Sequence, residues 1–208
     1  MKRWLSFWRE HVRAMGLAVI LFIFGGVIGF LFWQPLSHVM QDILSQLVEK
    51  VGIESNKEVN SLSLFFGLFM NNSIAVVILI LSGFLFGIYP AWGMILNGLL
   101  LGYLLAATTY SGGNPFAMFI FGILPHGIFE IPALILGATY GLIFGAAVFK
   151  WIIRLFSPRL RAEDPVQWKK MFRPLLPTLG VTLLLLLIAA AIESTVTVYL
   201  VKTFVAGV

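Results

Sequence analysis

Residues 124–132 read Leu-Pro-His-Gly-Ile-Phe-Glu-Ile-Pro, which places a histidine and a glutamate four positions apart between two prolines. From residue 113 to residue 148, no other charged side chain occurs. A titratable side chain within a membrane-spanning sequence costs free energy to bury, so it is by default a starting point for a functional hypothesis. The rest of the chain therefore has to account for His126 and Glu130.

The composition indicates a membrane protein. Of 208 residues, 60% are hydrophobic and only 11% are charged, and the mean hydropathy is +0.97. Soluble domains are about 45–50% apolar and about 25% charged. We therefore predict an all-α integral membrane protein that forms a single polytopic domain over residues 1–208. The chain contains no cysteine, which excludes disulfides, thiolate metal ligands and a cysteine nucleophile.

Hydropathy and length predict five transmembrane helices. They cover residues 14–33, 73–89, 94–110, 131–149 and 175–200. The fourth is expected to follow a short re-entrant or interfacial helix over residues 116–124. An unbroken helix over residues 116–149 would run about 51 Å against a hydrocarbon core of roughly 30 Å. We expect the break at Pro125, Gly127 and Pro132.

The outer segment 35–70 separates the first two spans. Apolar residues recur at three- and four-residue steps over residues 36–51, the pattern of an amphipathic helix that lies on the membrane surface. Residues 63–70 predict a second interfacial helix. Asn71 and Asn72 are expected to interrupt the chain before the second span begins.

Charge predicts the orientation. Four basic residues lie among the first thirteen, and seven lie in the loop 150–173. The positive-inside rule places both segments in the cytoplasm, so the outer segment 35–70 and the C-terminus lie outside. The basic loop is also expected to contact the lipid bilayer through anionic headgroups. Glycines spaced four apart predict close helix packing and, more weakly, a homodimer.

Several polar side chains occur inside or beside the predicted spans. They are Asn71, Asn72, Asn97, His126, Glu130 and Glu193. Counted by helix rise from the cytoplasmic ends, Glu130 lies about 30 Å deep and Glu193 about 28 Å deep. Both glutamates are therefore expected at a similar level in the outer half of the membrane, close to His126. The same estimate places Asn97 in the cytoplasmic half.

This intramembrane polar site has three interpretations. The side chains satisfy one another's hydrogen bonds. Alternatively, His126, Glu130 and Glu193 bind a divalent cation such as Zn²⁺. In the third interpretation they move protons or a solute across the membrane. An intramembrane metal-dependent hydrolase would need the same residues to activate water. Because no catalytic motif occurs, we expect no enzyme, and we expect no nucleic-acid partner.

The motifs resemble those of the stage II sporulation protein M family. They are the pair Asn71-Asn72, Asn97-Gly98 with Gly102, the stretch 124–133, and Ala-Ala-Ala-Ile-Glu ending at Glu193. The resemblance covers nearly the whole chain and implies a multi-pass protein of a bacterial cell membrane. It implies that the namesake anchors two peptidoglycan-degrading partners during engulfment of the forespore. It supplies no role for the polar residues, and we expect this chain to be a paralogue from the broader branch.

The sequence thus predicts a non-enzymatic membrane scaffold. Its outer segment 35–70 would bind membrane or envelope proteins and organise a complex at the cell envelope. The alternative is a small-solute or ion transporter or channel subunit, expected as a homodimer, that works through His126, Glu130 and Glu193.

Overall fold

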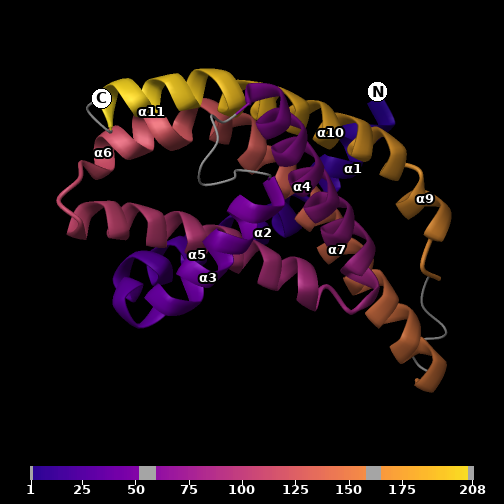
Figure 1. Cartoon of the computed structure of the whole chain (residues 1–208). Helices are drawn as coiled ribbons and strands as arrows, with labels where there is room; N and C mark the ends of the chain where they lie inside the picture. Colours follow the sequence, from indigo (N-terminus) through magenta and orange to yellow (C-terminus); the bar gives the residue numbers. More distant parts are fainter. Residues whose placement is uncertain (1, 52–59, 158–164, 206–208) are drawn as a thin grey trace.

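The computed structural model describes residues 2–51, 60–157 and 165–205. Within these ranges, five helical segments are long and apolar enough to cross a membrane (Figure 1). They are Val12–Leu31, Ser61–Phe84, Ile88–Tyr110, Pro115–Phe156 and Trp168–Phe204. The predicted all-α fold with five spans is confirmed. Residues 52–59 of the outer segment, 158–164 of the basic loop and 206–208 of the C-terminal tail lie outside the described residues.

The N-terminal helix α1 (Lys2–Glu10) leads into α2 (Val12–Leu31), the first span. Phe7 and Trp8 of α1 are buried. The indole nitrogen of Trp4 donates a hydrogen bond to Thr178 Oγ1 in the last span, over 3.1 Å. The basic N-terminal segment is therefore attached to the bundle through its aromatic side chains.

Helix α2 packs along the third span, α5 (Ile88–Tyr110). Five glycines line this contact: Gly25, Gly26, Gly29, Gly98 and Gly102. A Cβ atom at Gly98 would collide with the carbonyl oxygen of Phe22, so only glycine allows the two backbones to approach this closely. The contact between α2 and α5 of the same chain thus accounts for the predicted role of these glycines in helix packing.

Helix α3 (Trp33–Val51) begins the outer segment and lies beside α5. Trp33 stacks on Tyr110, with ring centroids 4.6 Å apart. Met40 is only 2% exposed and packs with Tyr103. Gln41 and the residues near it on the opposite face are exposed, in agreement with the predicted amphipathic pattern.

Helix α4 (Ser61–Leu81) is continuous, so the predicted interfacial helix 63–70 with a break at Asn71 is wrong. The helix begins one residue after Asn60, whose side chain accepts a hydrogen bond from the Leu62 amide. The side chain of Asn71 donates to Asn72, so neither amide group has to end the helix. Both asparagines lie in the middle of α4 and not at the start of a span.

The turn between the second and third spans, expected between residues 89 and 94, lies earlier in the chain. A 3₁₀ segment, η1 (Ser82–Phe84), ends the second span, and α5 begins at Ile88. Phe86 and Gly87 have positive φ angles of 58° and 75°. This conformation reverses the chain three residues before Pro90, which instead occupies the first turn of α5, where proline is tolerated.

The fourth span consists of α6 (Pro115–Ala117), a π-helical segment η2 (Met118–Ile123) and α7 (Leu124–Phe156). The predicted break at Pro125, Gly127 and Pro132 is wrong, because α7 continues through Pro132. A proline inside a membrane helix is tolerated where neighbouring helices satisfy the freed backbone groups. The departure from α geometry comes earlier, in the wider turns of η2.

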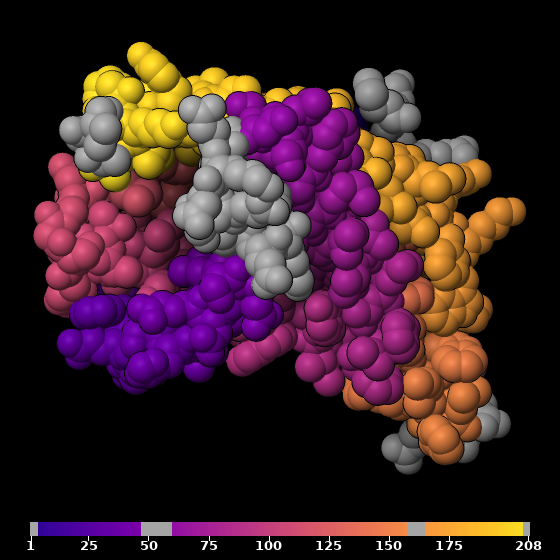
Figure 2. Space-filling view, in the orientation of Figure 1, coloured from indigo at the N-terminus to yellow at the C-terminus, as the bar shows by residue number. Residues whose placement is uncertain are grey.

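The last span comprises α9 (Trp168–Phe172), α10 (Leu175–Ile192), a second π-helical segment η3 (Glu193–Thr197) and α11 (Val198–Phe204). Helix α10 packs against both α7 and α4, and α4 lies beside it across one face of the molecule (Figure 2). Phe121 in η2 stacks on Phe204 in α11, with ring centroids 4.6 Å apart. This packing brings η2, α7 and η3 together around the polar residues.

Candidate functional site

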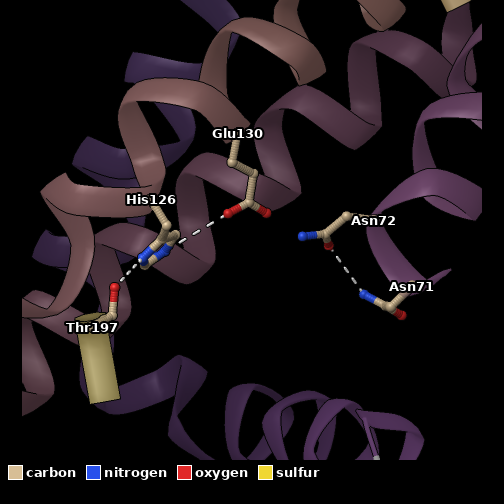
Figure 3. Close-up of polar contacts among 5 residues, drawn as sticks. All are labelled: Asn71, Asn72, His126, Glu130 and Thr197. Atoms are coloured by element: carbon tan, nitrogen blue, oxygen red, sulfur yellow. Dashed lines mark hydrogen bonds and ion pairs between the residues drawn. The ribbon is translucent and has the colours of Figure 1, made fainter. Parts of the chain in front are cut away.

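His126 and Glu130 lie one turn apart near the start of α7 (Figure 3). Their side chains face each other, with 3.7 Å between His126 Nε2 and Glu130 Oε2. The i, i+4 arrangement requires an intact helix at this point, and α7 supplies one despite Pro132.

Glu193 of η3 completes a cluster of three titratable groups. One ligand atom from each of His126, Glu130 and Glu193 lies within 4.8 Å of the others, and all three residues are partly buried. Two charged carboxylates 4.8 Å apart repel by roughly 3.5 kcal/mol at an effective dielectric constant of about 20. A proton or a cation between them removes this repulsion.

Asn72 connects α4 to the cluster. Its side-chain nitrogen points toward the Glu130 carboxylate (Figure 3). Asn71 Nδ2 in turn donates to Asn72 Oδ1 over 3.3 Å, which fixes the orientation of the Asn72 amide. The Asn71-Asn72 pair, predicted as part of the polar site, thus reaches this site from the middle of α4, where Asn72 faces α7.

Thr197 is a fourth contact that the sequence analysis missed. Its hydroxyl lies 3.4 Å from His126 Nδ1, on the side of the ring away from Glu130. A signal was available, since residues 193–197 read Glu-Ser-Thr-Val-Thr and interrupt an otherwise apolar span. Thr197 lies four residues after Glu193, and both face this site.

Both π-helical segments of the described chain adjoin the cluster. η2 ends three residues before His126, and η3 contains Glu193 and Thr197. π-helical turns are rare and occur frequently at functional sites, where they reorient side chains. Their placement here favours a site with a role beyond helix packing.

Asn97, the sixth predicted residue, is not brought into this network. Its Nδ2 atom donates to the carbonyl oxygen of Gly93, one turn earlier in α5, over 2.8 Å. An amide that bonds its own helix in this way satisfies itself locally. Of the six predicted residues, the structure therefore joins five.

These features define a class of polytopic helical membrane protein. Its fourth and fifth spans bring three titratable side chains together, and the second span lies beside them. The chain belongs to the stage II sporulation protein M family, whose family model matches residues 18–198. The predicted family is thereby confirmed.

Two similar proteins come from the archaeon Methanocaldococcus jannaschii. Uncharacterized protein MJ0793 is 26% identical over 182 residues, covering 87% of this chain and 92% of its own. Uncharacterized protein MJ0706 is 27% identical over 184 residues, covering 88% of this chain and 77% of its own. No solved structure matches the chain significantly.

Proposed function

We propose that this chain is a non-enzymatic membrane scaffold that organises a protein complex at the cell envelope. The observation that supports this proposal is that only one face of α3 packs against the rest of the protein, while the opposite face is exposed. Met40 and Leu36 pack toward α5, whereas Gln41 and Asp42 are exposed. A helix anchored by its apolar edge presents the polar edge in a fixed orientation, which suits recognition of a partner.

The charge pattern supports an outer position for this surface. Seven basic residues over 150–173 and four at the N-terminus favour the cytoplasm by the positive-inside rule. Helix α3 follows the first span and so emerges on the opposite side. Partners that recognise it would be envelope proteins or the outer parts of other membrane proteins.

Family membership is the second support. The family's namesake is implied to anchor peptidoglycan-degrading enzymes during sporulation, but similar proteins also occur in an archaeon. We therefore propose a general envelope role for this chain and not one confined to engulfment.

Proximity labelling in membranes tests the scaffold, with the labelling enzyme fused to the C-terminus, which is expected on the same outer side as α3. The informative variant combines Gln41→Arg with Asp42→Arg, two exposed positions that leave the packed edge of α3 intact. It is expected to lose a defined set of labelled envelope proteins that the wild type retains. Lys169→Glu, a charge reversal on exposed α9, is the matched control and should retain the set. Identical labelling in all three chains would refute the proposal.

A second candidate is a transporter or channel subunit, favoured by the cluster of His126, Glu130 and Glu193. Two cavities of the structure, of about 360 and 470 Å³, are lined by other residues and so lend this candidate no support. Flux measurements in proteoliposomes distinguish the candidates. Transport predicts that Glu130→Gln abolishes flux while the α3 variant keeps it. The scaffold predicts no flux above that of protein-free liposomes for any of these chains.

A further inference from the structure

We propose that His126, Glu130 and Glu193 bind one divalent transition-metal cation, with Zn²⁺ as the best match. This site is independent of the proposed scaffold, which needs no metal. The inference rests on the geometry of the three ligand atoms, on the charge balance, and on the partners that orient the ligand side chains.

The ligand atoms are nearly in place for a small cation. Zn²⁺ binds nitrogen and oxygen at about 2.0–2.2 Å, so two ligands of one ion lie at most about 4.4 Å apart, and about 3.4 Å apart in a tetrahedral site. The 3.7 Å between His126 Nε2 and Glu130 Oε2 is within this limit. All three ligand atoms lie within 4.8 Å of one another, so side-chain movements of about 1.4 Å or less would bring them to the tetrahedral spacing.

The charges balance for a divalent ion. Two carboxylates and a neutral imidazole carry a charge of −2, which one divalent cation neutralises. A monovalent cation would leave a negative charge inside a largely apolar part of the bundle, where an uncompensated charge is costly. The charge balance therefore favours a divalent ion over Na⁺ or K⁺.

Second contacts orient two of the three ligands. Thr197 Oγ1 lies 3.4 Å from His126 Nδ1, and we assign the ring proton to Nδ1 so that it donates to this hydroxyl. Nε2 then faces Glu130 with its lone pair. The side-chain nitrogen of Asn72 points toward the carboxylate of Glu130 (Figure 3). Metal-binding histidines and carboxylates almost always have such outer partners, which the chain supplies from η3 and α4.

The ligand types select among divalent ions. An imidazole ligand favours Zn²⁺ and related transition metals, whereas Mg²⁺ and Ca²⁺ prefer sites built of oxygen alone. The absence of cysteine from the chain excludes the thiolate sites that select Cu⁺. Histidine and glutamate are both established zinc ligands and occur together in catalytic sites built of two histidines and one glutamate.

Zinc binding to the purified full-length chain in nanodiscs tests the site. After treatment with a chelator, the protein is titrated with Zn²⁺ in competition with a chromogenic zinc indicator. The wild type is expected to bind one Zn²⁺ per chain, and a large excess of Mg²⁺ should not displace it. His126→Ala, Glu130→Gln and Glu193→Gln should each weaken binding by more than the roughly tenfold typical of losing an outer partner.

Matched controls use the same residue types at exposed positions. His38→Ala in α3 and Glu10→Gln in α1 remove a histidine and a glutamate away from the cluster, and should bind Zn²⁺ as the wild type does. Thr197→Val keeps the side-chain shape but removes the hydroxyl. It is expected to weaken binding by about tenfold through the orientation of His126.

The proposal is overturned if the wild type binds Zn²⁺ no better than His126→Ala, or if His38→Ala lowers affinity as much as His126→Ala. Loss of binding counts only for variants whose circular dichroism matches the metal-free wild type. If all three ligand variants misfold, zinc-edge X-ray absorption of the wild type decides. One imidazole with oxygen neighbours at about 2.0–2.2 Å supports the site, and the lack of an imidazole signal refutes it.

Discussion

Replacing Gly98 by alanine should separate α2 from α5. The added Cβ would collide with the carbonyl oxygen of Phe22 and the amide nitrogen of Gly26, both backbone atoms that cannot rotate away. Overpacking typically costs about 1–3 kcal/mol, and a backbone clash belongs at the upper end. Alanine regains about 0.5–1 kcal/mol through its helix propensity. We therefore expect a net loss of about 2 kcal/mol in the free energy of unfolding.

Gly26→Ala is the matched control on the facing helix. Its Cβ would lie 3.5 Å from the Gly98 carbonyl oxygen, an ordinary van der Waals distance. This variant is expected to be neutral or more stable by up to about 1 kcal/mol. Reversible unfolding in mixed micelles by added dodecyl sulfate, followed by tryptophan fluorescence, measures both. Equal stability of Gly98→Ala and Gly26→Ala would refute the argument from close backbone approach.

Three further predictions concern single polar contacts, each measured by the same unfolding assay unless stated. Tyr140→Phe removes the hydrogen bond from the phenol to the Met171 carbonyl oxygen, 2.6 Å long, and should cost about 1 kcal/mol; a loss below 0.3 kcal/mol would contradict it. Asn114→Ala removes the side chain that accepts from the first two free amides of α6, and should cost about 1 kcal/mol and speed hydrogen exchange there, whereas unchanged exchange would argue against the cap. Asn97→Ala should change stability by less than about 0.5 kcal/mol and leave zinc affinity unaltered, since its amide bonds only Gly93; a loss of zinc binding would return it to the site.

The five-span architecture could be predicted because it depends on composition and length. An apolar run of about 20 residues has few alternatives in a bilayer, and the backbone must bond within the helix. The same logic failed at Asn71 and Asn72. Their local polarity was interpreted as a helix boundary, whereas in the structure Asn71 donates to Asn72, whose side-chain nitrogen points toward Glu130 of a different helix (Figure 3). A partner distant in sequence is invisible to a local pattern.

The fourth span shows a second limit of local reasoning. The predicted break relied on the steric cost of Pro132, but α7 absorbs it and extends to Phe156. Three members of the polar site, His126, Glu130 and Glu193, could be found as titratable groups in apolar sequence. Thr197 could not be ranked above its polar neighbours, because its role depends on the π-helical hydrogen bonding of η3.

The π-helical turn of η3 makes the last span sensitive to length in a way that its composition hides. A π turn holds one residue more than an α turn, so deleting Val196 would let the span revert to a regular α-helix with its hydropathy unchanged. Because the wide turn takes up the extra residue, this deletion would leave the orientation of α11 relative to α10 nearly unchanged and would move only the residues within the turn. Thr197 would then follow Glu193 by three residues in place of four, so the two side chains could no longer meet His126 in the same geometry. The last span therefore positions its polar side chains through one extra residue, which a count of apolar residues does not reveal.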